Sequence, residues 1–527
     1  MKSVLEIMRY PVGKYDFKSI REEGYVYVDK TQFIPLLLEG TNYYFLARPR
    51  RFGKSMFLST LEYFFLGDRE IFRGLAVDSY KWDWQTYPVI RIDFGQSGYR
   101  SKDSLEQMLD YILSDYEKRY GVEKNSANPQ IRLISIIKKA REKTGLKVVV
   151  LVDEYEKPVT DNIDNREVME YNREILRSFY QVLKSADPYL KMVFLTGVTK
   201  FGQMSVFSGL NNLKDISMSL EFSAVCGVTE EELKGTFKAG ITKMAESANI
   251  DSDGALKLLK DNYDGYHFNY KCPDIYNPYS IVHAFADGKM GSYWSASGMP
   301  NLLSKVLKEH NYDLEKLNGV RTTERRLVGI NADFDDPVAL FYQTGYLTIK
   351  DYDPEDEIYT LGFPNREVEN AFFEGLMPVY SRMNNVETDT FIDRFREALI
   401  VGECMAAMHL LEDFSAGISY DVIPRVDIER HFQNLVYIVS KTLSSRKIRV
   451  SVEEKTSDGR IDLLIETQSY VYIIEIKYNG SAREALEQIK KKRYYLSYRG
   501  EERKIFLVGL NFSSETKRID SFEIEEV

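Results

Sequence analysis

A short apolar strand, a basic turn and a helix-forming run follow one another between Tyr43 and Leu66, and this succession constrains the fold more than any other stretch. The segment reads YYFLARPRRFGKSMFLSTLEYFFL, and Gly53, Lys54 and Ser55 end the turn. A phosphate-binding loop needs a Gly where the backbone passes close to the phosphates, a Lys that reaches their oxygens, and a Ser or Thr hydroxyl for Mg²⁺ at a helix start. The segment therefore predicts a P-loop between a strand and a helix.

The match to the generic pattern GxxxxGK[ST] is incomplete, because Arg48 stands where the first Gly is usual. Taken alone, RPRRFGKS is also compatible with a basic surface turn that happens to end in GKS. The apolar strand before it and the amphipathic run after it supply the context that a P-loop requires. We interpret the apolar face of that run as ordinary core.

Two carboxylates lie at the end of a second apolar run, KVVVLVDEYEKP, residues 147–158. Five consecutive aliphatic residues indicate a strand buried on both faces of a parallel sheet, with Asp153 and Glu154 at its C-terminal end. Ligands of open α/β sheets gather at such ends, so we expect Asp153 to hold Mg²⁺ and Glu154 to polarise the water that attacks the γ-phosphate. An acidic pair alone is often a solvated turn, but an upstream P-loop favours the catalytic interpretation.

Further strands are predicted at residues 88–95, 191–197 and 220–228, alternating with helical stretches. This alternation is typical of a parallel sheet with helices on both faces.

The order of a YVYVDKT run, an apolar helix, a strand and RPRRFGKS resembles the bacterial and archaeal AAA-ATPase-like family. An Arg at the first loop position is usual in that family, so the resemblance makes Arg48 an expected residue. It implies ATP as the nucleotide, with Arg48 and Arg51 joining Gly53, Lys54 and Ser55 in its binding.

Thr196 lies where related ATPases carry a sensor of the γ-phosphate, so the resemblance also implies a nucleotide-binding role for it. A residue that simply begins the loop explains Thr196 equally well, and both interpretations stay open. An arginine finger cannot be assigned from the sequence, because several arginines are candidates.

The middle of the chain, residues 229–350, is helical and aromatic in composition. The resemblance suggests a helical lid with a YDGYHF element, followed by a winged-helix-like unit around residues 341–349. We interpret His267 and His283 as packing residues, since no second ligand lies at metal spacing. The acidic run at residues 351–357 is expected to be a turn or linker.

Near the C-terminus, GRIDLLIE and YVYIIEIK are typical of two adjacent strands. Asp462 lies in the first, while Glu475 and Lys477 flank one residue in the second and so point to the same face. Two carboxylates and a lysine on one face can bind a hard divalent cation and steer a water at a phosphodiester. We expect Asp462 and Glu475 to hold Mg²⁺, with Mn²⁺ as an alternative, and Lys477 to orient the water. Taken alone, EIK is equally typical of an alternating exposed face.

The order of these strands and a following helix, ALEQIKKKRYYLSY, resembles the PD-(D/E)XK nuclease fold, and in particular the module found C-terminal to AAA-ATPase-like domains. The resemblance implies a catalytic role for Gln488, matches Tyr494, and places a Glu on the first helix, for which we select Glu429. The Pro of the family name is absent before Asp462, but it is dispensable across the superfamily. The basic run at residues 490–493 either contacts a nucleic-acid backbone or is a solvated helix face.

Composition limits the classes of function. A chain of 527 residues is too long for one core, and its formal net charge of −10 disfavours a protein that coats nucleic acid with its whole surface. Cys226, Cys272 and Cys404 lie far apart, which argues against a disulfide framework and a zinc site. No apolar run of about 18 residues appears, so we expect no membrane insertion and a cytoplasmic location.

We therefore expect an α/β protein with a P-loop NTPase parallel sheet at residues 1–228, a helical lid and winged-helix-like region at 229–350, a helical connector at 351–419, and a restriction-endonuclease-like α/β domain at 420–527. The expected function is an ATPase whose nucleotide gates Mg²⁺-dependent cleavage of nucleic acid, with DNA as the expected partner, and analogy suggests defence against mobile DNA. Two alternatives remain: a nucleotide-dependent switch or scaffold that binds nucleic acid without cutting it, and an ATPase that does not cut. The sequence does not decide whether the substrate is DNA or RNA, or whether ATP is hydrolysed or only bound. It also leaves the oligomeric state open, and a homo-oligomer is compatible with it.

Overall fold

The structure is a computed structural model, and the residues that it describes fall into two compact units. The first unit comprises Met1–Ala296 and Asn318–Val368, and the second comprises Ser297–Leu317 and Glu369–Val527. The described residues are 8–124, 126–200, 212–294, 303, 307, 312–328, 337–381, 383–417, 428–444, 447–456, 459–500 and 502–527.

A parallel sheet forms the centre of the first unit. In the described part of the chain its strands follow the order β2-β3-β4-β1-β5, so that β4 separates the strand before the P-loop from the strand that ends in Asp153. Every residue of β1 and β3 is buried, which explains why both strands are continuous apolar runs. The strands are β1 (Tyr43–Ala47), β2 (Val89–Asp93), β3 (Val148–Asp153), β4 (Leu190–Gly197) and β5 (Lys214–Asp215).

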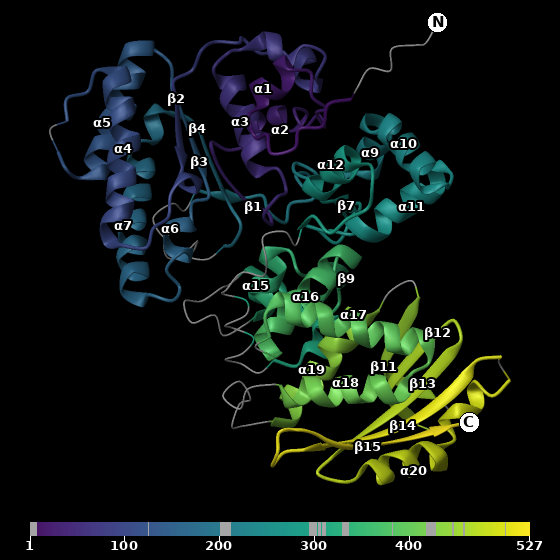
Figure 1. Cartoon of the computed structure of the whole chain (residues 1–527). Coiled ribbons are helices and arrows are strands. Elements are labelled where there is room, and N and C mark those ends of the chain that lie inside the picture. Colours follow the sequence, from purple (N-terminus) through teal and green to yellow (C-terminus); the bar gives the residue numbers. More distant parts are fainter. Residues whose placement is uncertain are drawn as a thin grey trace, which may run out of the picture. The chain divides into compact units, whose positions relative to one another are not determined.

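Helices cover both faces of this sheet, as the sequence predicts. Figure 1 shows α1, α2 and α3 on one face and α4, α5 and α7 on the other. The apolar side of α3 packs on β1, β3 and β4 in one core that includes Leu58, Leu46, Leu151 and Phe194. The helices are α1 (Phe17–Glu22), α2 (Phe33–Glu39), α3 (Lys54–Phe65), α4 (Lys102–Tyr120), α5 (Pro129–Thr144), α6 (Lys157–Thr160) and α7 (Arg166–Ser185).

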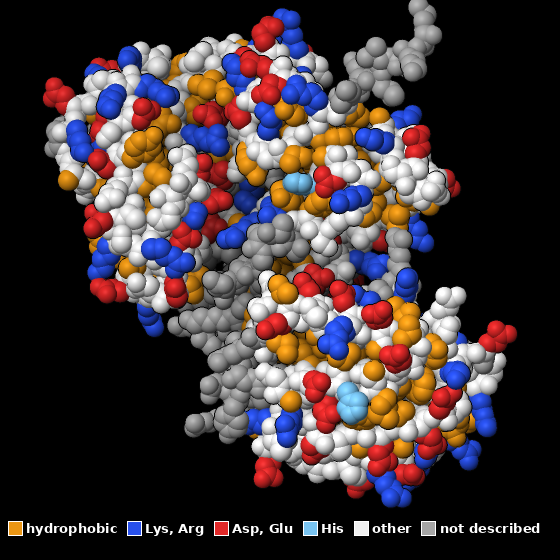
Figure 2. Space-filling view, viewed as in Figure 1, with side chains coloured by type: hydrophobic (Ala, Val, Ile, Leu, Met, Phe, Trp, Pro, Cys, Tyr) orange, Lys and Arg blue, Asp and Glu red, His pale blue; other side chains and the backbone are white. Residues whose placement is uncertain are grey.

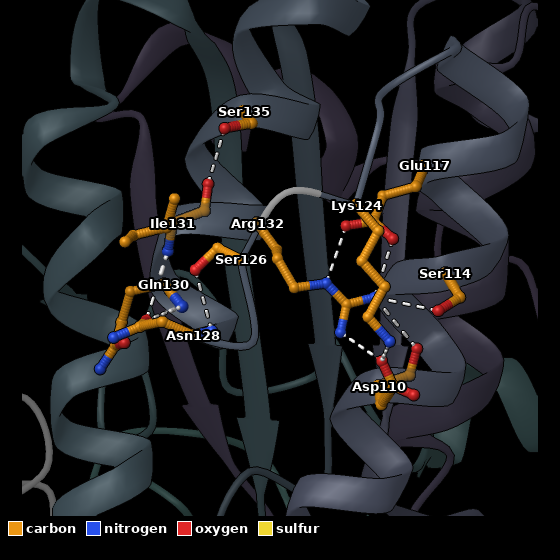
Figure 3. Close-up of polar contacts among 10 residues, drawn as sticks. All are labelled: Asp110, Ser114, Glu117, Lys124, Ser126, Asn128, Gln130, Ile131, Arg132 and Ser135. Carbon is orange, nitrogen blue, oxygen red and sulfur yellow. Dashed lines mark hydrogen bonds and ion pairs between the residues drawn. The ribbon is translucent and has the colours of Figure 1, made fainter.

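A buried arginine ties α4 to α5. Arg132 is 3% exposed, and its guanidinium donates to both carboxylate oxygens of Glu117 at 2.7 and 2.8 Å, to Ser114 at 2.9 Å, and to Asp110 (Figure 3). The Asn128 side chain accepts hydrogen bonds from the first amides of α5, which explains why that helix begins at Pro129. These contacts fix the helical layer on one face of the sheet.

The expected strand at residues 220–228 is wrong. Its last residue, Val228, begins a short strand β6 (Val228–Thr229) that pairs with β7 (Ile275–Tyr276) outside the main sheet, and β5 takes the expected place in the sheet. The rest of the segment runs through turns that bury Phe222 and Val225 in the core. Apolar composition was mistaken for extended structure, because turns bury these side chains equally well.

The remainder of the first unit is helical and then forms a small antiparallel sheet, as expected for the middle of the chain. The helices are α9 (Glu230–Thr236), α10 (Lys238–Ala248), α11 (Ser252–Tyr263) and α12 (Pro278–Asp287). The small sheet has the order β8-β10-β9 and is accompanied by α14 (Glu324–Val328) and α15 (Pro337–Thr344). Its strands are β8 (Val320–Thr323), β9 (Thr348–Asp353) and β10 (Ile358–Gly362). The acidic run at residues 351–357 contributes the end of β9 and the hairpin turn to β10, so it is not a linker.

The second unit is a mixed sheet between helices. Its strands follow the chain order β11-β12-β13-β14-β15, and all pairs are antiparallel except β13 with β14, which α20 (Ala482–Lys492) connects. Figure 1 shows α20 on one face of the sheet and α17, α18 and α19 on the other. The strands are β11 (Ile448–Thr456), β12 (Gly459–Thr467), β13 (Tyr470–Tyr478), β14 (Lys504–Ser513) and β15 (Arg518–Glu526). The remaining helices are α16 (Arg366–Ser381), α17 (Asn385–Val401), α18 (Cys404–Ala416) and α19 (Ile428–Leu443).

Among the described residues, none of the helices combines the length and the apolarity that crossing a bilayer requires.

Candidate functional sites

The loop between β1 and α3 has the backbone of a phosphate cradle. Gly53 directly precedes α3 and has a φ of +92°, a left-handed conformation that strains any residue with a Cβ. Because this N-cap is a glycine, no side chain of its own blocks the first amides of α3, which carry the partial positive charge of a helix N-terminus. Ser55 follows on the first turn and is half-buried. This arrangement suits the phosphates of a nucleotide.

Lys54 is the first residue of α3, and its side chain reaches back to this loop. Its ammonium donates to the backbone carbonyls of Arg48 and Pro49, both at 2.9 Å. Burial lowers the pKa of Lys54, and the carboxylates of Asp153 and Glu156 act in the opposite direction. The loop lysine and the acidic end of β3 therefore belong to one electrostatic site. Figure 2 shows Lys and Arg side chains gathered in a hollow of the first unit close to β1.

The carboxylate of Asp153 is held from the neighbouring strand. Thr196 Oγ1 donates to Asp153 Oδ1 at 2.6 Å, and the amide of Glu154 donates to the same oxygen at 3.2 Å. Asp153 is only 2% exposed. Glu154 has a φ of +50°, and burial raises the pKa of its carboxyl. The structure thus brings Asp153, Glu154 and Thr196 together at the strand ends, while the role of each stays a prediction.

The two arginines expected to bind the nucleotide contact protein carbonyls, and their nucleotide-binding role stays a prediction. Arg48 is 1% exposed, and its guanidinium donates to Ser217 at 2.6 Å and to Phe222 at 3.1 Å. Arg51 donates to the carbonyls of residues 293–294 at 2.7 and 2.9 Å. Arg48 therefore anchors the turns that follow β5.

Sequence reasoning missed Glu156, a third carboxylate near the P-loop. Its Oε1 accepts hydrogen bonds from the amides of Val198 and Thr199 at 2.5 and 3.1 Å. Its Oε2 is buried and has no hydrogen-bond partner among the described residues. Burial raises the pKa of Glu156 to about 7. The only signal in the sequence was a second Glu two positions after Glu154, which a turn would also explain.

In the second unit, β12 and β13 bring the predicted nuclease residues together. Asp462 lies one residue before Leu463, which pairs with Ile474, so Asp462 comes opposite Glu475 in the antiparallel ladder. Asp462 Oδ2 accepts a hydrogen bond from the amide of Ile476 at 2.8 Å. The two carboxylates therefore meet on the face of the sheet that α20 covers.

Gln488 of α20 connects the two remaining members of this site. Lys477 Nζ donates to Gln488 Oε1 at 2.5 Å, and Gln488 Nε2 donates to Glu475 Oε1. Glu475 is 3% exposed, and its other oxygen, Oε2, has no hydrogen-bond partner in the described part of the chain. Burial, reinforced by the nearby Asp462 carboxylate, raises the pKa of Glu475 to about 7. Burial also raises the pKa of Asp462.

The two further matched positions lie close to this site. Tyr494 is buried and donates to the backbone carbonyl of Arg460 on β12 at 2.9 Å, which ties the segment after α20 to that strand. Burial raises the pKa of Tyr478, and the carboxylates of Glu429 and Asp462 add to the shift. Glu429 on α19 and Asp462 on β12 thus share Tyr478 as a neighbour.

Two residues that support the site escaped the sequence analysis. Gly509 of β14 pairs with Glu475 in register, and Asn511 pairs with Lys477. Asn511 Oδ1 accepts from the amide of Gly480 at 2.9 Å and so fixes the turn between β13 and α20. A glycine or asparagine inside a strand carries no distinctive pattern, so nothing in the sequence marked either one.

Comparison with known proteins agrees with both halves of the chain. The family described as "Predicted AAA-ATPase" matches residues 11–207, and the "PD-(D/E)XK nuclease superfamily" matches residues 427–522. The chain is also 34% identical over 526 residues to the "Uncharacterized protein in vnfD 5'region" of Azotobacter chroococcum mcd 1, covering 98% of this chain and 99% of that protein. The predicted fold class is confirmed by the parallel sheet, the helical middle and the mixed C-terminal sheet. The chain belongs to the family of AAA-ATPase-like proteins that carry a C-terminal PD-(D/E)XK nuclease domain.

Proposed function

We propose that this protein is an ATPase whose nucleotide state gates Mg²⁺-dependent cleavage of nucleic acid, with DNA as the substrate and defence against mobile DNA as the biological role. The observation that carries the proposal is the buried carboxylate of Glu475, which lies beside Asp462 and Lys477. One of its oxygens lacks a hydrogen-bond partner among the described residues. An unpaired buried carboxylate costs folding free energy, which a bound cation would offset.

The donor set of this site fits Mg²⁺. Asp462 and Glu475 provide carboxylate oxygens, and the carbonyl of Ile476 is the expected third ligand. Within the described residues, no group of three or more His, Cys, Asp or Glu side chains is arranged to hold a metal, so water would complete the shell, as is common for Mg²⁺. When bound, the ion would lower the pKa of a water and stabilise charge on the phosphate. Lys477, held by Gln488, would orient that water beside the scissile phosphate.

The P-loop supports the nucleotide half of the proposal. The amides after Gly53 and the ammonium of Lys54 would hold the phosphates of ATP. Ser55 and Asp153 would hold the Mg²⁺ that accompanies ATP, with Thr196 fixing the Asp153 carboxylate. Burial raises the pKa of Glu154, which favours acceptance of a proton from the attacking water.

Exposed lysines on α20 support a polynucleotide substrate. Lys491 and Lys492 follow Gln488 by three and four residues, so they lie on the same side of the helix as this site residue. Both are exposed. Lys490, in contrast, forms an ion pair with Glu525 of β15 at 2.6 Å. Exposed cations beside the site suit the phosphates of a nucleic-acid strand on either side of the cleaved bond.

The test is cleavage of circular and linear DNA, and of RNA of the same sequence, by the pure protein with Mg²⁺, with and without ATP. The parent is expected to cut DNA, and Asp462→Asn is expected to lose cleavage by on the order of 10²-fold or more while it still hydrolyses ATP. Lys54→Ala is expected to lose ATP hydrolysis and the effect of ATP on cleavage. Equal activity in Asp462→Asn and the parent would remove the nuclease assignment. Binding of DNA without any cleavage of DNA or RNA would leave a nucleotide-dependent switch.

A further inference from the structure

Arg51 of the P-loop binds the backbone carbonyls of two consecutive aromatic residues, Tyr293 and Trp294, which are far from it in the sequence. Its guanidinium donates from Nη1 to the carbonyl of Tyr293 at 2.7 Å and to that of Trp294 at 2.9 Å. The same guanidinium lies over the ring of Tyr279, 4.2 Å from its centroid. Arg51 itself has a φ of +66°, so the backbone of the loop is held in the left-handed region at this residue. The partners of this guanidinium in the phosphate-binding loop are thus two neutral carbonyls and an aromatic ring.

Glu367, on the first turn of α16, binds the backbone amides of the same two aromatic residues. Its Oε1 accepts hydrogen bonds from the amides of Tyr293 at 2.5 Å and Trp294 at 2.8 Å, and its Oε2 accepts from the hydroxyl of Ser280 at 2.7 Å. Glu367 is 3% exposed. Burial raises the pKa of this carboxyl, and the charge of Arg51 acts against the shift. We call this arrangement of Arg51, residues 293–294 and Glu367 the P-loop clamp.

The P-loop clamp lies at both points where the chain leaves the first unit. The first departure follows Ala296, two residues after Trp294, and the second follows Val368, the residue after Glu367. Helix α16 contains the second departure, since it begins at Arg366 and continues to Ser381. A change in the clamp therefore acts on residues 293–294 and on the first turn of α16, which lie next to the two departures in the sequence.

We propose that Arg51 is a positioning residue that transmits the nucleotide state of the P-loop to residues 293–294 and to the first turn of α16. The inference rests on the proposed function and names how the nuclease is regulated. A phosphate offers a guanidinium an ion pair and a bidentate acceptor, which a neutral carbonyl does not, so a nucleotide phosphate in the loop competes with the carbonyls of residues 293–294 for Arg51. When the phosphate wins, the carbonyls of residues 293–294 lose this donor, and the first turn of α16, which Glu367 ties to the same residues, loosens where the chain leaves the first unit.

Amide hydrogen exchange of the full-length protein tests the clamp without any need for cleavage. Saturating ATP with Mg²⁺ is expected to speed exchange at the amides of Tyr293 and Trp294 by about tenfold or more in the parent. Arg51→Ala is expected to exchange fast at these amides already without ATP and to show no further response, while Arg51→Lys recovers part of the protection. Arg50→Ala is the matched control, because Arg50 is the exposed neighbour in the same loop, and it is expected to respond like the parent.

The ratio of cleavage rates with and without ATP is the second readout. It is expected to fall to about one in Arg51→Ala and to stay at the parent value in Arg50→Ala. An Arg51→Ala variant that keeps the parent's exchange response, or the parent's ratio, would overturn the inference. Calorimetry of ATP binding distinguishes failure of the proposed function from failure of the clamp mechanism. If the parent binds no ATP, the proposed function itself is wrong. If ATP binds but exchange at residues 293–294 does not change, only the clamp mechanism is wrong.

Discussion

Gly509 lies beside Glu475 in the parallel β13–β14 ladder, and its lack of a side chain lets α20 approach β14 closely. A Cβ built on Gly509 would lie 2.1 Å from the carbonyl oxygen of Ala482 and 2.7 Å from the amide nitrogen of Leu486. Both contacts are to the backbone of α20, the helix that carries Gln488 to the Glu475 carboxylate. The glycine therefore sets how closely α20 approaches the strands that carry Glu475 and Lys477.

Gly509→Ala is expected to displace α20, to destabilise the second unit by about 1–3 kcal/mol and to abolish cleavage, because overpacking against backbone forces a shift of the helix. Thermal unfolding and a cleavage assay measure the two effects, while ATP hydrolysis is expected to stay at the parent rate. Gly500→Ala is the control, since a Cβ there meets nothing within 4 Å. Full cleavage by Gly509→Ala would show that α20 does not position the site.

Thr196→Val is expected to lower the rate of ATP hydrolysis about tenfold or more with little change in shape, because it removes the hydroxyl that donates to Asp153. Leaving a buried carboxylate without one of its hydrogen-bond donors costs about 1–3 kcal/mol of free energy. Steady-state ATPase kinetics measure the loss, and Thr196→Ser, which keeps the hydroxyl, is expected to retain most of the activity. If Val and Ser variants hydrolyse ATP equally well, the hydroxyl does not orient Asp153.

Glu156 is expected to make the first unit less stable as pH rises. Its folded pKa of about 7 exceeds the ordinary value of 4.5, so the folded state binds more protons than the unfolded state between these two values. Stability from this group is therefore full below about pH 4.5 and is lost as pH rises through 7, by up to about 3 kcal/mol.

Urea unfolding at pH 5 and pH 8 measures this dependence. Glu156→Gln, which cannot ionise, is expected to flatten it, whereas Glu142→Gln on the exposed side of α5 is expected to leave it unchanged. A pH dependence that is identical in Glu156→Gln and the parent would contradict the assignment.

Arg132→Met is expected to destabilise the first unit by about 3–5 kcal/mol, because it leaves the Glu117 carboxylate, 4% exposed, without its cation. The exposed pair of Arg119 with Asp115, at 3.5 Å on the same helix layer, provides the comparison. Arg119→Met is expected to cost no more than about 1 kcal/mol. Chemical denaturation of both variants measures the loss of unfolding free energy. Similar losses would show that burial of the ion pair does not determine its contribution to stability.

The ends of the buried strands were predictable from the sequence because their chemistry is local. Gly53 and Lys54 follow one apolar strand, Asp153 and Glu154 end another, and the spacing of Glu475 and Lys477 fixes their common face. In each case a few neighbouring residues contain both the secondary structure and the functional groups. The structure places these groups as the patterns indicate.

Residues whose partners lie far along the chain were not predictable. The guanidinium of Arg48, for example, donates to carbonyls about 170 residues away, and no local pattern in the sequence indicates these contacts. The same holds for Gly509, which matters only because α20 passes over it. The strand predicted at residues 220–228 was wrong for another reason: the turns at residues 220–226 bury apolar side chains as a strand does.

The segment Ser297–Leu317 belongs to the second unit although it lies between two stretches of the first. Its Tyr312 carbonyl and Leu314 amide both bond to the side chain of Asn434 on α19, at 2.8 and 3.1 Å. A single cut in the polypeptide therefore cannot release an intact nuclease half, and a clone that starts after Val368 would lack part of its own folding unit. The chain crosses from one unit to the other three times, so neither unit corresponds to one continuous stretch of the sequence.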